Sequence, residues 1–542
     1  MRARLPLVPP RRFLPSLFAL ALVAPLAAPL TWAGDWTNNG GNAARNGLSD
    51  EVGPPAADPL WNGGRSSIIA WQPMIAGRRV FSVRQTGFPP SGEPNGSPVV
   101  CQDLDTGAEQ WLRNIPYVAG DWTTFLLGTS NGRVYAGRSG NGASVSQIFY
   151  ALDQATGNTV WTSVQPIDAG PYDGICFAAN GDLVIGNAAS VRRVSAVDGS
   201  TLWDVPRICN VTSSCGIALF ANAVYVAEPA PGGNWIRKLD LATGGTLYNT
   251  VVMPGFTSQN TPFVGPDGTV YLSRTQNNPA VDFLYAFSDS GTSLALRWDE
   301  PAGWSTTSEF GCAPDGTVYM LDRDNKLRGY DSNTGDLKHV SVDPIGTGAL
   351  APHMAVDRSG KLYASNGGFS NGRLYAFNPD LSLRWSFGVQ NINQGGPALG
   401  EDGTLVVTGI GTNIRAFRSS CQTPASSTVR NFFTNPTSLD ASLPILGSTW
   451  TATVDLTQTG HATAILVARA SPTIVPLGGG QTLLCTGTKL YSATQAGPLA
   501  TFTNPIPNDI ALCGFTLCVQ AAHLGMVTPF ALSNALDLVV GG

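Results

Sequence analysis

Residues 149–161 read FYALDQATGNTVW, which is a strand, a Thr-Gly turn and a second strand that ends in tryptophan. Apolar and polar residues alternate on both sides of the turn, and this two-residue period is typical of a half-buried β-strand. The unit recurs about every 40 to 50 residues, and a fixed period of this length predicts a repeat architecture. Further copies lie at 99–111, 191–203, 235–248, 283–298, 326–339 and 373–385, with a bare NIRAF at 413–417.

A second hairpin precedes each unit, and its turn is a pair such as Asn131–Gly132 or Asp267–Gly268. Alternating strands such as RVYAG and TVYLS follow these pairs. Asn-Gly and Asp-Gly favour type I′ turns, because both central residues of that turn have positive φ. We predict eight such hairpins, with turns at 76–77, 131–132, 180–181, 222–223, 267–268, 315–316, 359–360 and 402–403.

The eighth unit lacks its last strand, whereas DPLW at 58–61 stands unpaired before the first hairpin. The pattern therefore predicts an all-β fold in which an eight-bladed β-propeller is closed by an N-terminal strand from residues 58–61. Closure is favourable because an open ring would expose one blade face and one sheet edge.

An aromatic residue, or once a histidine, ends the repeat units at one position. A large aromatic ring at a repeated strand position is typical of packing between blades, and we interpret the set as a structural ring without ligand contacts. It consists of Trp61, Trp111, Trp161, Trp203, Tyr248, Trp298, His339 and Trp385.

The pattern [LV]YA[LF]D-x-x-TG-x-x-x-W, with DWTNNGGNAARNGLS at 35–49 as its lead-in, resembles the pyrroloquinoline-quinone-like (PQQ-like) repeat family over roughly residues 35–418. That family includes quinoprotein alcohol dehydrogenases and also cofactor-free propellers such as the outer-membrane barrel-assembly lipoprotein. The resemblance implies the propeller fold, and fold alone does not choose a function.

Quinoprotein dehydrogenases hold their quinone beneath two adjacent, disulfide-bonded cysteines, near a calcium ion and an aspartate base. This chain has no Cys-Cys dipeptide, so that ligand set cannot be transferred to it and no cofactor is expected. The four histidines are scattered, and the chain has no GxxxxGK[ST], HExxH or GxSxG motif. We therefore expect a non-catalytic binding or scaffold protein. The alternative is a quinoprotein-type oxidoreductase or a polysaccharide-active propeller enzyme.

Residues 1–33 combine four arginines, an apolar stretch and small residues near Ala33, which predicts a secretory signal peptide. We expect a secreted or cell-surface protein, with the periplasm as the alternative, and no later membrane span. Without the signal, 28 Lys and Arg stand against 37 Asp and Glu, and basic runs are absent. This charge pattern argues against nucleic acid as a partner. We expect a monomer.

All nine cysteines lie after residue 33, and an odd number leaves at least one unpaired within the chain. We predict a disulfide between Cys209 and Cys215, which flank the short NVTSS loop. A second bridge is expected from Cys485 to either Cys513 or Cys518.

Long connections between the second and third strands of several units predict a binding face, because loops on a rigid scaffold carry recognition residues. The connections between units should emerge on the same face. Its candidate residues are Trp122, Tyr172, Trp235, Trp304 and His353. Aromatic residues among amides and glycines suit a protein or glycan partner. The alternative is that these aromatics plug the channel mouth.

The repeat stops after Phe417, which divides the chain into a signal peptide (1–33), the propeller (34–418), a polar linker (419–440) and a C-terminal domain (441–542). Five or more short alternating strands with Gly and Pro between them predict a small β-sandwich for the last part. PIPNDIALCGFTLCVQAA at 505–522 resembles modules that end many large secreted bacterial proteins.

Overall fold

The structure is a computed structural model, and the part of the chain that it describes has several gaps. The expected signal peptide, Cys209, Cys215, Trp122, Tyr172 and Trp304 lie outside this part, as does the side chain of His353. The described residues are 34–86, 96–116, 123–139, 148–166, 175–187, 189–208, 216–255, 261–277, 280–301, 310–322, 324–345, 353–366, 372–389, 392, 395–421, 423–432, 435–507, 510–525 and 530–542.

The described residues between 59 and 417 form eight antiparallel sheets, numbered here in chain order. Sheets 1 and 2 contain β2 (Met74–Ala76), β3 (Arg79–Val83), β4 (Val99–Asp103) and β5 (Glu109–Arg113), then β6 (Thr123–Ser130), β7 (Arg133–Ser139), β8 (Phe149–Asp153) and β9 (Thr159–Thr162). Sheets 3 and 4 contain β10 (Cys176–Phe177), β11 (Leu183–Gly186), β12 (Ser190–Val194) and β13 (Thr201–Pro206), then β14 (Ala218–Phe220), β15 (Ala223–Ala230), β16 (Gly233–Asp240), β17 (Thr246–Asn249) and the short β18 (Met253–Pro254).

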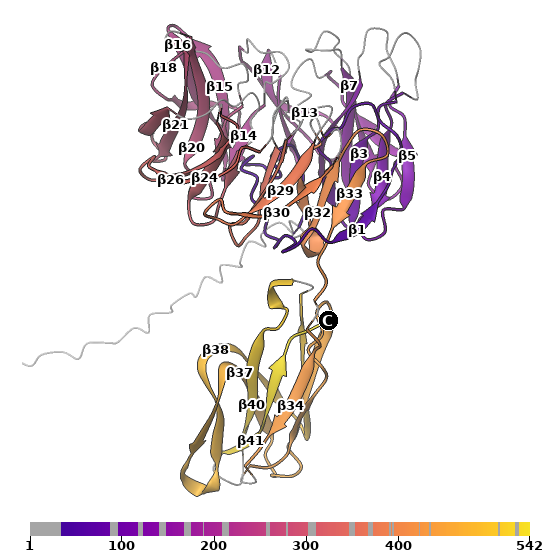
Figure 1. Ribbon diagram of the computed structural model, residues 1–542, viewed down its shortest axis with the longest axis vertical. Helices are drawn as coiled ribbons and strands as arrows, with labels where there is room; N and C mark the ends of the chain where they lie inside the picture. The colour runs from indigo at the N-terminus through magenta and orange to yellow at the C-terminus, as the bar shows by residue number, and fades with distance from the viewer. Residues whose placement is uncertain are drawn as a thin grey trace, which may run out of the picture. The chain divides into compact units, whose positions relative to one another are not determined.

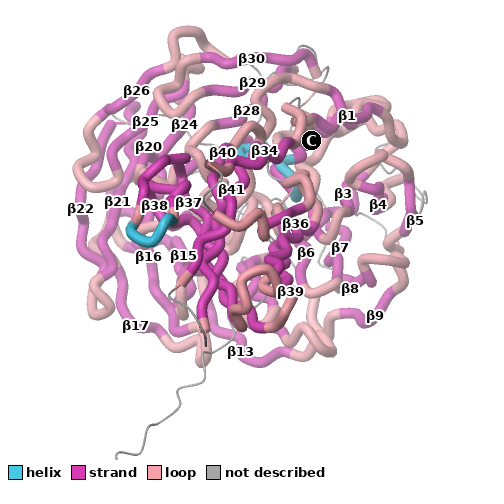
Figure 2. Tube along the Cα trace, turned by 90° about the horizontal axis from the view of Figure 1, so that it is seen from below, coloured by secondary structure: helices cyan, strands magenta, loops and turns pink. Residues whose placement is uncertain are grey.

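Sheets 5 to 8 continue the same order. Sheets 5 and 6 contain β19 (Phe263–Val264), β20 (Val270–Asn277), β21 (Ala280–Asp289) and β22 (Leu294–Pro301), then β23 (Gly311–Cys312), β24 (Thr317–Leu321), β25 (Leu327–Asp331) and β26 (Leu337–Val340). Sheets 7 and 8 contain β27 (His353–Val356), β28 (Leu362–Asn366), β29 (Arg373–Phe377) and β30 (Leu383–Gly388), then β31 (Ala398–Gly400), β32 (Thr404–Thr408), β33 (Ile414–Phe417) and β1 (Pro59–Asn62), with the 3-10 turn η2 (Glu401–Gly403) between β31 and β32. Figure 2 shows the sheets following one another around a ring, with the last strand of each sheet at the rim.

The ring is closed by strand β1, which pairs antiparallel with β33. Trp61 lies opposite Ala416, and Asn62 lies opposite Arg415. In Figure 1 the indigo β1 runs beside the orange β33, although more than three hundred residues separate them. This pairing confirms the prediction that residues near 58–61 complete the last repeat unit, and it confirms the all-β propeller fold.

Apolar clusters between neighbouring sheets form the core of the ring. Phe81 and Val99 of sheet 1 share one cluster with Val134 and Leu152 of sheet 2. A larger cluster joins sheets 7 and 8 to Ile75 of sheet 1. Each sheet thus buries both faces against its neighbours, and this burial is the main favourable contribution to folding.

The lead-in segment, residues 34–54, lies along the first strands of the sheets instead of forming a separate tail. Backbone and side-chain groups of this segment hydrogen-bond to each sheet in turn, which supplies partners for strand edges that would otherwise lack them. The contacts run from Trp36 to Ile75, Thr37 to Thr129, Asn38 to Ile175, Ala43 to Leu219, Ala44 to Val264, Asn46 to Cys312, Gly47 to Val356 and Ser49 to Leu399. Nothing in the repeat pattern predicted this role.

The turns of the first hairpins differ in part from the prediction. Asn131 and Gly132 have φ of 50° and 71°, as a type I′ turn requires. In sheets 3, 5, 6 and 7 the prediction is wrong, because three residues form the loop and only its glycine has positive φ. In sheets 1 and 4 the two-residue turns lie one residue away from the predicted pairs, at 77–78 and 221–222. In sheet 5 the Asp267 side chain accepts a hydrogen bond from the Thr269 amide at 3.0 Å, which favours a type I turn before Gly268.

The C-terminal part contains two sheets that share one apolar core, with Trp450 and Val454 on one sheet and Leu466 and Leu536 on the other. The first sheet has the order β34 (Ser426–Arg430), β41 (Ala531–Val539), β40 (Thr516–Leu524), β37 (Thr463–Pro476) and β38 (Thr482–Ala496). The second has the order β35 (Leu439–Ala441), β36 (Thr449–Asp455) and β39 (Leu499–Pro505), and the 3-10 turns are η3 (Gly478–Gly480) and η4 (Ile510–Leu512).

Two features of this part correct or refine the sequence analysis. The segment predicted as a linker, 419–440, contains β34 and the start of β35, because its alternating residues pair with β41 and β36. Cys485 is bonded to Cys518, one of its two predicted partners, and Cys421 is bonded to Cys513. No helix in the described ranges is long and apolar enough to cross a membrane.

A buried histidine makes the stability of the C-terminal part depend on pH. His523 is fully buried between the hydroxyls of Ser438 and Thr459, at 3.1 and 3.2 Å. Burial, together with the nearby His461, lowers the pKa of His523 from 6.5 to about 4. The unfolded chain therefore binds this proton more readily than the folded protein, so the stability conferred by the neutral ring is complete above pH 6.5 and is lost as the pH falls toward 4.

We expect the free energy of unfolding of the C-terminal part to fall by about 1.4 kcal/mol per pH unit below 6.5, and by about 3 kcal/mol in all. Urea unfolding at a series of pH values, compared with the variant His523→Gln, measures this slope. The other titrating groups contribute equally to the pH slope of both proteins, so the difference between the two slopes is the contribution of His523. An identical pH slope in both would contradict the assignment to His523.

Candidate functional site

The aromatic residues of the predicted ring lie at the junctions between sheets. The Trp111 indole of sheet 1 donates to the Gln154 carbonyl of sheet 2 at 2.8 Å and lies over Gly157 in the same turn. Within sheet 1, Trp111 lies opposite Cys101, a buried residue of the neighbouring strand. Trp61, Trp161, Trp203 and Trp298 make the same pair of contacts with the next sheet, through the carbonyls of Leu104, Ala196, Leu241 and Ser332.

Three positions of this set depart from the common geometry. Trp385 lies 6.1 Å from Phe417 of sheet 8, measured between ring centroids. His339 is in β26, opposite Gly329. The Tyr248 hydroxyl donates to the carboxylate of Asp289 in sheet 5, where a tryptophan would donate to a carbonyl.

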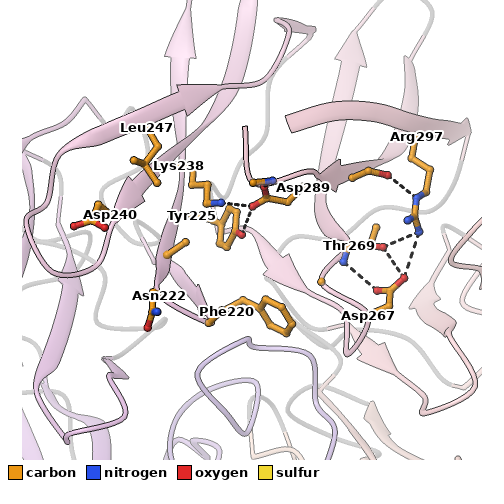
Figure 3. A pocket seen from close by; sticks show the side chains of 15 residues that line it. Phe220, Asn222, Tyr225, Lys238, Asp240, Leu247, Asp267, Thr269, Asp289 and Arg297 are labelled. Carbon is orange, nitrogen blue, oxygen red and sulfur yellow. Dashed lines mark hydrogen bonds and ion pairs between the residues drawn. The ribbon is translucent and has the colours of Figure 1, made fainter. Parts of the chain in front are cut away.

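The Tyr248 junction between sheets 4 and 5 is open. The β21–β22 hairpin extends further than its counterparts, since Asp289 still pairs with Leu294, and Trp298 follows Gly291 by seven residues whereas Trp111 follows Gly107 by four. No atom lies within 4 Å of the position where Gly291 would carry a Cβ. A cavity of about 480 Å³ lies here, lined by the turns of sheets 4 and 5 (Figure 3).

A buried ion pair forms one wall of the cavity. Lys238 Nζ lies 2.6 Å from Asp289 Oδ2 and donates to the Tyr248 hydroxyl at 2.6 Å. The hydroxyls of Tyr225 and Tyr248 donate to Asp289 at 2.6 and 2.5 Å, and the Gly291 amide donates at 2.9 Å. Figure 3 shows Tyr225, Lys238 and Asp289 turned toward one another. The repeat has cysteine, alanine or glycine at most positions equivalent to Lys238, so a charged network replaces apolar packing at this junction.

A second ion pair forms the other wall. Arg297 lies 3.3 Å from Asp267 and donates to the Thr269 hydroxyl at 2.8 Å and to the Ser288 hydroxyl at 2.8 Å. These contacts fix the guanidinium at the mouth of the cavity (Figure 3). Arg297 and Asp267 therefore compensate each other's charge.

The charged groups of the cavity are poor acids and bases at neutral pH. Burial would raise the pKa of Asp289, but the donors Lys238, Tyr225 and Tyr248 lower it to about 2. Burial would lower the pKa of Lys238, but its bond to Asp289 raises it above the usual range. A general base or a nucleophilic amine needs a pKa near the working pH. The arrangement is suited to binding polar groups more than to proton transfer.

The structure describes one of the long connections that the sequence places on the binding face, namely residues 228–235 in sheet 4. Residues 228–235 were predicted as a loop, but they continue the ladder of β15 and β16 as far as Ala230 and Gly233. Trp235 is half-buried in this hairpin, and its indole nitrogen lies 3.5 Å from Glu228 Oε2. The face opposite to the cavity therefore carries a protruding, paired hairpin (Figure 1).

Apolar side chains surround this hairpin. Val251 and Val252 are 60% and 40% exposed, and they precede β18, which pairs with β16 at Asn234. Ile208 is 65% exposed and follows Arg207, whose guanidinium donates to the Ala227 carbonyl of β15 at 2.7 Å. We call Ile208, Trp235, Val251 and Val252 the hairpin patch.

The described residues do not fit a quinone site of the kind that the family resemblance implies. Cys101, Cys176 and Cys312 are buried in three different sheets, so no two of them form the adjacent pair of a quinone site. Burial raises the pKa of Cys101 to about 12, so its thiol is inert. In the same ranges, no group of three His, Cys, Asp or Glu side chains is placed to bind a metal ion.

Sequence reasoning missed the cavity. It interpreted Tyr248 as one more packing aromatic and residues 283–298 as one more copy of the repeat. Two signals were available, namely a lysine at a position where most units have small residues, and two extra residues between Ala286 and Trp298 relative to Ala151 and Trp161. Their meaning depends on how neighbouring sheets pack.

Comparison with known proteins supports the fold. A family model described as outer membrane protein assembly factor BamB matches residues 95–338. No curated protein matches the chain. The quinohemoprotein alcohol dehydrogenase from Comamonas testosteroni has a similar structure, with a TM-score of 0.50, 12% identity, and coverage of 74% of this chain and 83% of that chain. At this identity the similarity concerns the fold alone.

Two further solved structures were found with lower scores. The computationally designed Ika8 protein has a TM-score of 0.46 and 12% identity, covering 67% of this chain and all of that chain. A europium-containing methanol dehydrogenase has a TM-score of 0.40 and 11% identity, covering 62% of this chain and 90% of that chain.

Two lines of evidence place the protein outside the cytosol. The disulfides Cys421–Cys513 and Cys485–Cys518 are typical of an oxidising compartment, and together with the family match they indicate an extracellular or periplasmic protein. The repeat pattern, the eight sheets and the match over residues 95–338 lead to one conclusion: this chain contains a β-propeller that is similar to the PQQ-like repeat family.

Proposed function

We propose that this protein is an exported, non-catalytic binding propeller that recognises a protein partner on the face that carries the β15–β16 hairpin. The observation that carries this proposal is the hairpin patch. Trp235 is half-buried in the hydrogen-bonded β15–β16 ladder, and the aliphatic side chains of Ile208, Val251 and Val252 are exposed in segments outside the strands. A side chain that is held in such a ladder loses little conformational entropy when a partner covers it.

The charge around the patch also favours a protein partner. Glu228 and Arg237 form an ion pair at 2.9 Å beside Trp235, and both side chains are largely buried. Polar groups at the border of an apolar centre are typical of protein interfaces. The family model that matches this chain is described as an assembly factor, a role that also depends on protein contacts.

Substitution of the patch tests the proposal. We expect Trp235→Ala to weaken partner binding by about 2 kcal/mol, or about thirtyfold, because interface tryptophans are frequent anchors. The double change Val251→Ser with Val252→Ser should act in the same direction. Trp122→Ala and Trp304→Ala extend the test to the residues that the sequence places on this face. Retention of the partner by immobilised protein, incubated with the envelope and secreted fractions of the source cells, measures the effect.

The matched control is Leu202→Ala, which changes a 50% exposed apolar residue on the last strand of sheet 3. It should leave both binding and the unfolding temperature unchanged. If the patch variants unfold as easily as core variants and their folded fraction binds normally, the aromatic residues are structural plugs and the proposal fails.

A further inference from the structure

The cavity between sheets 4 and 5 interrupts an otherwise repeated packing device. At five junctions a tryptophan ring covers the turn glycine of the next sheet, so that a Cβ built on Gly157, for example, would lie 2.6 Å from Trp111. The other covered glycines are Gly107, Gly199, Gly244 and Gly335. At the junction of sheets 4 and 5, the extended β21–β22 hairpin removes Gly291 from this cover and leaves about 480 Å³ open. This volume is within the range of about 300–1,000 Å³ that is typical of small-molecule sites.

The charges of the cavity select against an anionic ligand. Lys238 is paired with Asp289 in a largely buried pair, and Arg297 is paired with Asp267 at the exposed mouth. An anion could bind to Lys238 only by separating it from Asp289, which would leave a largely buried charge without a partner. The two pairs are each neutral and the Asp240 carboxylate adds a negative charge, so the cavity favours a polar ligand without an acidic group.

Several groups remain available to such a ligand. The Thr243 amide and hydroxyl both donate to Oδ1 of Asp240, which leaves Oδ2 as an acceptor. The Asn222 amide lines the cavity and offers both a donor and an acceptor. The ring of Phe220 and the half-exposed Leu247 provide an apolar surface between these polar groups (Figure 3).

We infer that this cavity binds a neutral saccharide. Sugar hydroxyls can donate to Asp240 and exchange hydrogen bonds with Asn222, while the C–H face of the ring packs on Phe220 and Leu247. The two ion pairs then hold the walls at a fixed distance and need no rearrangement. This site lies on the face of the short turns, so the inference does not depend on the proposed protein partner.

The first test uses the full-length protein with glucose, galactose, maltose and cellobiose, and with glucuronic acid as the anionic analogue. Saturation-transfer difference NMR detects binding, and calorimetric titration gives the dissociation constant. We expect at least one neutral sugar to bind, and to bind more tightly than glucuronic acid. No saturation transfer to any neutral sugar at about 10 mM, or tighter binding of glucuronic acid, would overturn the inference.

A pair of isosteric variants then tests the carboxylate. Asp240→Asn should weaken sugar binding by about tenfold, because it removes a charged acceptor. Asp153→Asn is its control, since Asp153 makes the same hydrogen bonds to its own turn, through Thr156, in sheet 2. Equal affinities for the two variants would contradict a role for Asp240 in the site.

A second pair tests the cavity by filling it. Leu247→Trp places an indole in the cavity, whereas Leu202→Trp makes the same change at the same strand position of sheet 3, and both leucines are 50% exposed. We expect the first variant to lose sugar binding and the second to retain it, with both unfolding near the wild-type temperature. Binding by both variants would show that the sugar binds elsewhere. If Leu247→Trp is destabilised, the comparison of Asp240→Asn with Asp153→Asn still decides whether the sugar binds in this cavity.

Discussion

Removal of residues 34–62 is expected to abolish cooperative unfolding of the propeller. The deletion removes β1 and leaves one edge of β33 without its antiparallel partner. It also removes the lead-in segment, whose groups hydrogen-bond to the first strands of all eight sheets, and the buried Arg45 that donates to the Ile217 carbonyl at 2.6 Å. Unpaired strand edges and unburied sheet faces cost more than the few kcal/mol by which proteins are stable.

Circular dichroism and calorimetry of the exported protein measure this effect. The control is a chain that begins at residue 34, which retains every contact of the described structure. A shorter deletion of residues 34–54 separates the lead-in from β1, and we expect it to lower the unfolding temperature strongly while the propeller still closes. A single sharp transition at the control temperature after removal of 34–62 would contradict closure by this segment.

Trp161→Ala is expected to destabilise the propeller by about 3–5 kcal/mol, because it empties a large volume that neighbouring strands cannot fill. The Trp161 ring lies 5.8 Å from Tyr135 and 5.7 Å from Phe149, between ring centroids, and its indole donates to the Ala196 carbonyl at 3.1 Å. The variant should therefore unfold at a clearly lower urea concentration than the wild type.

Two further variants make this result specific. Val160→Ala changes the preceding, 44% exposed residue of β9 and should cost less than about 0.5 kcal/mol. Trp161→Phe keeps most of the ring volume but loses the hydrogen bond to Ala196, so its cost should fall between the other two. If Trp161→Ala and Val160→Ala unfold at the same urea concentration, the indole does not stabilise the junction between sheets 2 and 3.

Local patterns predicted the parts of the fold that repeat. The alternating strands, the Thr-Gly turns and the spare DPLW strand are local features, and the structure has each of them at the expected place. The turn types of several hairpins were wrong because Asp-Gly is compatible with both two-residue and three-residue loops. The side chain of Asp267, which caps its own turn, decides between them.

The sequence by itself determined the repeat and its period, because strand pairing within one unit joins residues that are near one another along the chain. It also determined the strand that closes the ring, although β1 and β33 are far apart in the chain, because the eighth unit lacks one strand and DPLW is a spare one. Only the tertiary structure decided the path of the lead-in and the position of the open junction. Both depend on groups hundreds of residues apart, such as Ser49 with Leu399, or on different sheets, such as Lys238 with Asp289. No local period encodes those contacts, so Tyr248 looked like another packing aromatic until its neighbours were known.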